Sequence, residues 1–274
     1  PGVDAWKGDP MTFSNPIPIR PGLLHQTYTI TDIKEENYRT RTFTLDRPVP
    51  AEPGQFVMAW LAADSEIPFS ITGDDPFTLT ATAVGPTSPL VKGLQVGGRL
   101  RARGPIGHGF RPHGQKMLLV GGGFDIGPLL FLARRALAGG AAVDVILAAR
   151  TAKEIIMVEA FEQAGACVLV TTEDGLQGET GPVTGPLERL LLDPASRPDG
   201  GVYAVGPVRM LEEIDRVCGE HKVPRQLSWE VVMRRGRCAM GLCGECELQL
   251  PDSLDDPDRA AWLVCLDGPV SHTE

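Results

Sequence analysis

The chain has 274 residues, enough for two domains of ordinary size and a smaller third region. Hydrophobic residues make up 42% of it and charged residues 22%, the proportions of a globular protein rather than of a disordered one. A net charge of -9 argues against nucleic acid or an anionic membrane as a partner, because both bind basic surfaces.

Two features of the sequence favour a cytoplasmic protein. The longest apolar stretches, such as residues 126–133, are far shorter than the roughly 20 residues of a membrane-spanning helix. Residues 1–10 lack the charged flank and apolar core of a secretion signal. We therefore expect cytoplasmic localisation, no membrane span and cysteines that stay reduced.

The first part of the chain is predicted to form an antiparallel β-barrel. Residues 1–22 are rich in proline and lack periodicity, so we expect an extended N-terminal arm there. Short alternating or β-branched runs follow, separated by turns rich in Pro and Gly. These runs span residues 23–33, 38–45, 55–61, 77–84 and 99–103. The pattern predicts a barrel of about six strands over residues 23–112.

After Pro112 the pattern changes to strands that alternate with helices. The predicted strands are 116–120, 142–148, 167–172 and 201–205, and the predicted helices are 126–138, 153–163, 187–192 and 209–220. This alternation predicts βαβ units and a doubly wound parallel-sheet α/β domain over residues 113–225. Cys167 and Cys218 each fall in an apolar pattern of this domain, and we expect both to be buried.

Four of the six cysteines gather in the small C-terminal region, residues 226–274. A region of this size usually needs a metal, disulfides or a larger neighbour in order to fold. Cys238, Cys243 and Cys246, followed by the distant Cys265, have the C-x4-C-x2-C…C spacing of plant-type [2Fe-2S] ligands. Structural zinc is the alternative, but it favours two C-x2-C pairs, and this region has one. The spacing therefore predicts a [2Fe-2S] cluster.

The surroundings of this cysteine loop carry two further signals. Arg234, Arg235 and Arg237 precede the first cysteine, and they either form a solvated turn or offset the cluster's charge and help to dock a partner. Two predicted strands, 247–250 and 263–266, would bring Cys265 back to the loop.

A glycine-rich turn, which begins Gly121-Gly122-Gly123-Phe124-Asp125, joins a predicted strand to a predicted helix. Such a turn lets a dinucleotide pyrophosphate lie against backbone N–H groups at the start of a helix. It departs from the strict G-x-G-x-x-G pattern, and a turn without a ligand is the alternative. Asp125 would repel a diphosphate, or it would serve as the helix N-cap.

Motifs along most of the chain, taken together, resemble the ferredoxin reductase superfamily. They are the barrel segments 67–70 (Ile-Pro-Phe-Ser) and 104–110 (Gly-Pro-Ile-Gly-His-Gly-Phe), the glycine-rich turn, the approach segment 227–230, the cysteine loop and segment 265–270. In this order they are most similar to the electron transfer subunits of NAD-linked class B dihydroorotate dehydrogenase.

This resemblance implies FAD on the barrel, NAD on the α/β domain and a [2Fe-2S] cluster on the C-terminal region. The residues implied for FAD are Pro68, Phe69, Ser70, Ala81, Thr82, Ala83, Thr87, Ser88 and Gly107. Those implied for NAD are Gly121, Gly122 and Gly123, and those implied for the cluster are Cys238, Cys243, Cys246 and Cys265.

The sequence departs from the family pattern at three positions. Ile67 replaces the usual Arg that pairs with the FAD diphosphate, Asp125 replaces a common Gly, and Val205 replaces a Cys near the nicotinamide. The choice between NAD, NADP and neither stays open on these residues.

The family's function is to relay electrons between NAD(H), FAD and the cluster on one side and a catalytic flavoprotein on the other. The resemblance implies an FMN-containing dihydroorotate dehydrogenase as that partner. The alternatives are a relay subunit of a hydrogenase, sulfite reductase or bifurcating transhydrogenase, and a relay or scaffold that no longer uses NAD(P). The five histidines form no Ser/His/Asp or HExxH pattern, and the relay needs only bound cofactors, so we predict no catalytic residue in this chain.

Overall fold

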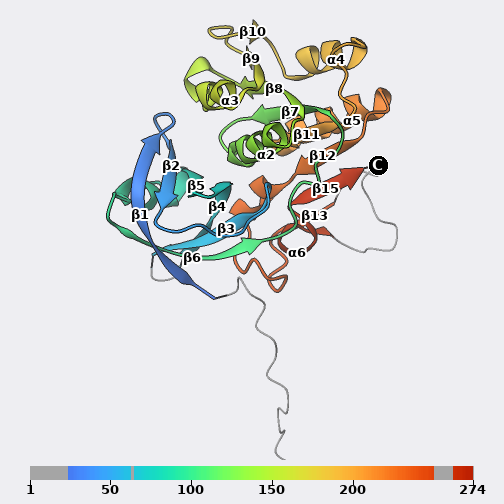
Figure 1. The fold of residues 1–274 in the computed structure, drawn as a ribbon. Coiled ribbons are helices and arrows are strands. Elements are labelled where there is room, and N and C mark those ends of the chain that lie inside the picture. Colours follow the sequence, from blue (N-terminus) through green and yellow to red (C-terminus); the bar gives the residue numbers. More distant parts are fainter. Residues whose placement is uncertain (1–23, 63–64, 250–261, 274) are drawn as a thin grey trace, which may run out of the picture.

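The computed structural model describes residues 24–62, 65–249 and 262–273. They form a β-barrel, a parallel sheet flanked by helices and a small C-terminal region (Figure 1). The predicted N-terminal arm, residues 1–22, lies outside the described residues. Within the described ranges, no helix has the length and apolar character needed to cross a membrane.

Six antiparallel strands close the barrel in the order β1-β2-β5-β4-β3-β6, which confirms the predicted barrel. The strands are β1 Gln26–Glu35, β2 Thr40–Leu45, β3 Phe56–Ala62, β4 Ser65–Asp74, β5 Phe77–Thr82 and β6 Arg99–Ile106. Phe43 and Phe69 are fully buried in the barrel interior, where their ring centroids lie 5.8 Å apart. The 3-10 turn η1 Gly85–Thr87 and the short helix α1 Ser88–Gly93 connect β5 to β6.

The second body is a seven-stranded sheet in the order β10-β9-β8-β7-β11-β12-β15. Its strands are β7 Lys116–Gly122, β8 Ala142–Ala149, β9 Cys167–Thr172, β10 Glu179–Thr180, β11 Val202–Val205, β12 Arg225–Ser228 and β15 Val270–Thr273. Neighbouring strands pair in parallel except for β12 and β15, which are antiparallel. The predicted doubly wound parallel sheet is therefore confirmed.

Helices α2 Gly127–Ala138, α3 Val158–Ala164, α4 Thr184–Leu192 and α5 Val208–Glu220 accompany this sheet. Helix α3 is shorter than predicted, because Met157 has the left-handed φ of 62° and separates it from the 3-10 turn η2 Ala152–Glu154. Cys218 is buried on α5, as predicted. The prediction for Cys167 is wrong, because this residue is exposed at the start of β9. Strand β10 pairs only with Thr171 and Thr172 at the other end of β9, so it does not cover Cys167.

The C-terminal region packs against both bodies. The 3-10 turn η3 Glu230–Arg234 leads into the cysteine loop, and β13 Glu247–Leu248 pairs with β14 Trp262–Leu263. Cys265 lies on the helical turn α6 Val264–Asp267 rather than on the predicted strand. Strand β15 then joins the α/β sheet beside β12, and the buried indole of Trp229 donates to Ser271 Oγ at 2.8 Å. These contacts anchor both ends of the region to the sheet.

Candidate functional site

A pocket of about 290 Å³ lies between the barrel, the glycine-rich turn and η3. Its volume is near the lower end of the roughly 300–1,000 Å³ typical of ligand pockets. The lining residues are Ile67, Pro68, Ser70, Thr80, Ala81, Thr82, Val84, Gly85, Pro86, Thr87, Asp125, Glu230 and Arg234. Ser70 and Thr80 lie opposite each other on β4 and β5, so the two strands present one continuous wall.

The structure brings together part of the residue set implied for FAD. The members that line the pocket are Pro68, Ser70, Ala81, Thr82 and Thr87. Phe69 points into the barrel core instead, because neighbouring strand residues face opposite sides. Ala83 and Ser88 do not line the pocket. Gly107, with a φ of +84°, packs against the C-terminal region, where an added Cβ would lie 2.3 Å from the carbonyl oxygen of Gly268.

Glu230 is a buried acid in this pocket; it lies in the approach segment 227–230, but no sequence pattern gave it a role of its own. Its Oε1 accepts a hydrogen bond from Ser70 Oγ at 2.7 Å, and its buried Oε2 has no partner among the described residues. Burial raises the pKa of this carboxyl group to about 8. Near neutral pH the carboxyl group therefore keeps its proton, and a buried polar atom without a hydrogen-bond partner costs about 1–3 kcal/mol. The pocket therefore fits a polar cofactor that can hydrogen-bond with this carboxyl group, such as an isoalloxazine ring.

An ion pair spans the same pocket. Arg234 Nη2 of η3 donates to both carboxylate oxygens of Asp125, at 2.7 and 2.8 Å. Arg234, one of the three arginines before the cysteine loop, is therefore paired with Asp125 of the glycine-rich turn. The alternative role of Asp125 as a helix cap is wrong, because the N-cap residue of α2 is Ile126.

The glycine-rich turn lies at the carboxyl end of β7, where the strand order of the parallel sheet reverses between β7 and β11. Gly123 has a left-handed φ of +74°. A Cβ on Gly122 would lie 2.2 Å from Met210 Sδ, and one on Gly206 would lie 2.4 Å from Met210 Cε, so a side chain at either position would displace this methionine. Dinucleotides bind in the crevice at such switch points, and the turn fits that placement.

The four clustered cysteines approach one another in two pairs. The N–H groups of Met240, Leu242 and Cys243 donate to Cys238 Sγ at 3.2–3.5 Å. Cys246 Sγ and Cys265 Sγ are 3.4 Å apart, close to the roughly 3.8 Å between two thiolates on one tetrahedral metal with bonds of about 2.3 Å. Within residues 24–62, 65–249 and 262–273, no three possible ligands already form a closed metal site. Their arrangement in two pairs fits a centre of two metal atoms in which two cysteine sulfurs bind each metal atom.

The two pairs differ in their surroundings. Cys243 is exposed, and backbone N–H groups, that of Arg237 foremost, lower the pKa of its thiol to about 7. Cys265 is buried, and burial raises the pKa of its thiol to about 12. Large apolar side chains near the thiols are exposed, with relative exposures of 80% for Leu242 and 37% for both Met240 and Leu266. The centre would therefore have one edge at an apolar surface.

Comparison with known proteins places the chain among relatives of similar length, although no family model matches it. A protein of Methanothermobacter thermautotrophicus named "Probable dihydroorotate dehydrogenase B (NAD(+)), electron transfer subunit" is 38% identical over 241 residues, which cover 86% of this chain and 84% of that protein. A protein of the same name from Methanopyrus kandleri is 34% identical over 249 residues, 89% of each chain. The chain belongs to this family of electron transfer subunits.

Solved structures agree with this assignment. The structure of an NADH-dependent reduced ferredoxin-NADP oxidoreductase, described for flavin-based electron bifurcation, matches the subunit with a TM-score of 0.75 and 26% identity, over 89% of this chain and 87% of that one. The ferredoxin reductase of carbazole 1,9a-dioxygenase matches with a TM-score of 0.61 and 21% identity, over 73% of this chain and 65% of that one, and it shares the fold. The expected resemblance to ferredoxin reductases is confirmed, and the subunit is an electron transfer component of an oxidoreductase.

Proposed function

We propose that the subunit relays electrons between NAD(H), FAD and a [2Fe-2S] cluster on one side and a catalytic dihydroorotate dehydrogenase on the other. One observation carries the proposal: the segment that brings Glu230 and Arg234 into the pocket continues directly into the loop of Cys238. A flavin in the pocket and a cluster on the loop would therefore be neighbours on one stretch of chain. The names of the relatives support NAD and a dehydrogenase partner.

FAD, when bound, exchanges a hydride with nicotinamide and single electrons with an iron-sulfur cluster. The chain's own residues bind and orient the groups. Ser70 and Glu230 supply a hydroxyl group and a carboxyl group to the pocket wall. Cys238 and Cys243 would hold one iron, and Cys246 and Cys265 would hold the other. The proposed domains are the barrel 23–112 for FAD, residues 113–225 for NAD and residues 226–274 for the cluster.

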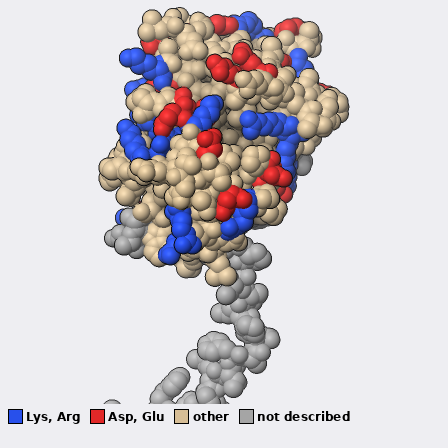
Figure 2. All heavy atoms as spheres, turned by 60° about the vertical axis from the view of Figure 1, so that its left-hand side comes forward, with Lys and Arg blue, Asp and Glu red and all other residues tan. Residues whose placement is uncertain are grey.

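The proposed partner is an FMN-containing catalytic subunit that docks over the cysteine loop. The exposed apolar side chains of Met240, Leu242 and Leu266 support this placement, because such residues are common at the centre of protein interfaces. On the face drawn in Figure 2, acidic and basic side chains are interspersed, so that face offers no broad basic area to a nucleic acid. We propose that the complex lies in the cytoplasm, where its thiols stay reduced.

The similarity to a bifurcating NADH-dependent oxidoreductase favours a second candidate, a relay subunit of a bifurcating transhydrogenase. Purification of the native complex under anaerobic conditions separates the two functions. Co-purification of a flavoprotein that oxidises dihydroorotate supports the first candidate. Co-purification of a large transhydrogenase subunit without that activity supports the second.

The cofactors are tested on the isolated subunit. After anaerobic reconstitution we expect about two irons, two sulfides and one FAD per chain, and bleaching of the flavin on titration with NADH. Bleaching by NADPH alone would reassign the nucleotide. Zinc in place of iron, or no acid-labile sulfide, would refute the proposed relay.

A further inference from the structure

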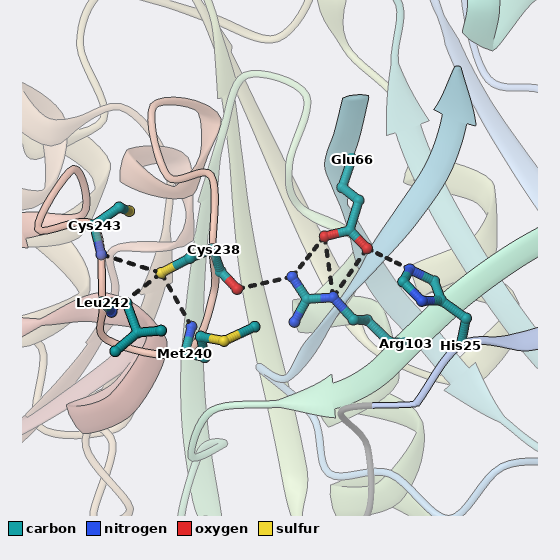
Figure 3. A network of polar contacts seen from close by, with 7 residues as sticks. All are labelled: His25, Glu66, Arg103, Cys238, Met240, Leu242 and Cys243. Atoms are coloured by element: carbon teal, nitrogen blue, oxygen red, sulfur yellow. Dashed lines mark hydrogen bonds and ion pairs between the residues drawn. The ribbon is translucent and has the colours of Figure 1, made fainter. Parts of the chain in front are cut away.

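A row of polar side chains runs from the barrel to the first cysteine of the loop (Figure 3). Arg103 of β6 donates from Nη2 to the backbone carbonyl oxygen of Cys238 at 2.8 Å. Its Nε and Nη2 also donate to the carboxylate of Glu66 on β4, at 2.6–3.0 Å. His25 Nε2 contacts Glu66 Oε1 on the far side. The barrel therefore holds a backbone atom of the cysteine loop through one guanidinium group.

Arg103 is buried although it is charged, with a relative exposure of 4%. Strand alternation points its neighbour Ala102 into the barrel core and Arg103 to the outer face, where the cysteine loop covers it. A guanidinium group in this position is tolerated only with a counterion and further hydrogen bonds. Glu66 supplies the counterion, and the Cys238 carbonyl group accepts a further hydrogen bond.

The peptide group that Arg103 holds precedes a strained residue. Ala239 has a φ of +46°, in the left-handed region that alanine rarely adopts, and it is buried. Such a conformation persists only where the surrounding structure fixes it. The same turn aims the N–H groups of Met240, Leu242 and Cys243 at Cys238 Sγ. These three hydrogen bonds therefore depend on the orientation of the 238–239 peptide.

We propose that Arg103 is a positioning residue for the cluster, an inference that rests on the proposed function. It holds the Cys238 carbonyl group so that Ala239 keeps its left-handed turn and the three N–H groups keep their aim at the sulfur. Hydrogen bonds to ligand sulfurs and nearby positive charge both favour the more negative, reduced state of a cluster. Arg103 therefore raises the reduction potential of the cluster. Because Arg103 belongs to β6, this potential depends on how the cysteine loop packs against the barrel.

The test compares Arg103→Gln, Arg103→Lys and the control Arg101→Gln, which alters an exposed arginine on the same strand. Hydrogen exchange of the cluster-free subunit reports the turn directly. We expect the amides of residues 240–243 to exchange about tenfold faster in both Arg103 variants, since a hydrogen bond from a charged donor contributes that much. The control should exchange like the wild type.

Two further measurements separate positioning from general stability. In the reconstituted subunit, dye-coupled titration and electron paramagnetic resonance should show a lower potential and altered g-values for Arg103→Gln, with a smaller change in potential for Arg103→Lys, which keeps the charge. Adding Ala239→Gly to Arg103→Gln should recover most of the amide protection, because glycine adopts the left-handed turn without strain.

Unchanged exchange at residues 240–243 in folded Arg103 variants would overturn the inference, as would the same effect in Arg101→Gln. If Arg103→Gln does not accumulate as folded protein, Arg103→Lys gives the same exchange readout. A wild-type subunit that binds neither iron nor sulfide would refute the proposed function instead. The exchange measurement would still decide the role of Arg103, because it needs no cluster.

Discussion

The stability of the flavin-free subunit should fall between pH 5 and 8 because of Glu230. Burial raises the pKa of this carboxyl group from its ordinary value of 4.5 to about 8 in the folded chain. Between these values the folded chain keeps a proton that the unfolded chain releases. The free energy of unfolding therefore decreases as pH rises, by up to about 1.4 kcal/mol per pH unit, or at most about 5 kcal/mol over the whole interval.

Replacing Glu230 by Gln removes this titration and keeps the size and shape of the side chain. Urea unfolding followed by circular dichroism at pH 5, 6, 7 and 8 gives the difference between variant and wild type at each pH. We expect that difference to shift steadily in favour of Glu230→Gln as pH rises, whereas Glu173→Gln, at an exposed position, shows no such trend. A difference that stays constant from pH 5 to 8 would refute the assignment of a raised pKa to Glu230.

Three further predictions concern single contacts. Arg234→Gln should weaken NAD⁺ binding about three- to tenfold, because the unpaired Asp125 carboxylate would repel the diphosphate. Adding Asp125→Asn to Arg234→Gln should restore the NAD⁺ affinity, and titration followed by flavin fluorescence measures both affinities. Cys265→Ser should abolish the iron-sulfur absorption and Cys218→Ser should keep it; the reverse result would move the cluster elsewhere. Iodoacetamide should label the exposed Cys167 and spare Cys218, whose pKa burial raises to about 12, as peptide mass spectrometry would show.

The sequence predicted most of the fold because the two bodies have different periodicities. Strand β4 was not delineated, since Pro68 falls within it and proline normally argues against a strand. The start of α3 was misplaced because the left-handed conformation of Met157 is not visible in a hydrophobic pattern. Cys265 was expected on a strand, but β14 ends at Leu263, just before it. Each difference arises from a local backbone feature that side-chain periodicity does not encode.

The candidate site divides in a similar way. The cysteine loop is visible because its ligands are close in sequence and their spacing carries the chemistry. The polar groups around it are not, since Glu230 is 160 residues from Ser70 and Arg103 is 135 residues from Cys238. Their burial and pairing depend on how barrel and C-terminal region pack together. A single sequence contains no signal of that packing, although segment 227–230 did mark the approach to the loop.

One face of β4 connects the two parts of the site. Glu66, Pro68 and Ser70 alternate with the inward-facing Phe69, so they lie on the same side of the strand. At one end Glu66 holds the arginine that contacts the Cys238 loop, and at the other Ser70 binds Glu230 in the pocket. Four residues of extended strand span about 13 Å, which sets the separation of the two contacts. Because β4 is hydrogen-bonded on both edges within a closed barrel, this separation is rigid, and the proposed relay would work across a fixed spacing between pocket and loop.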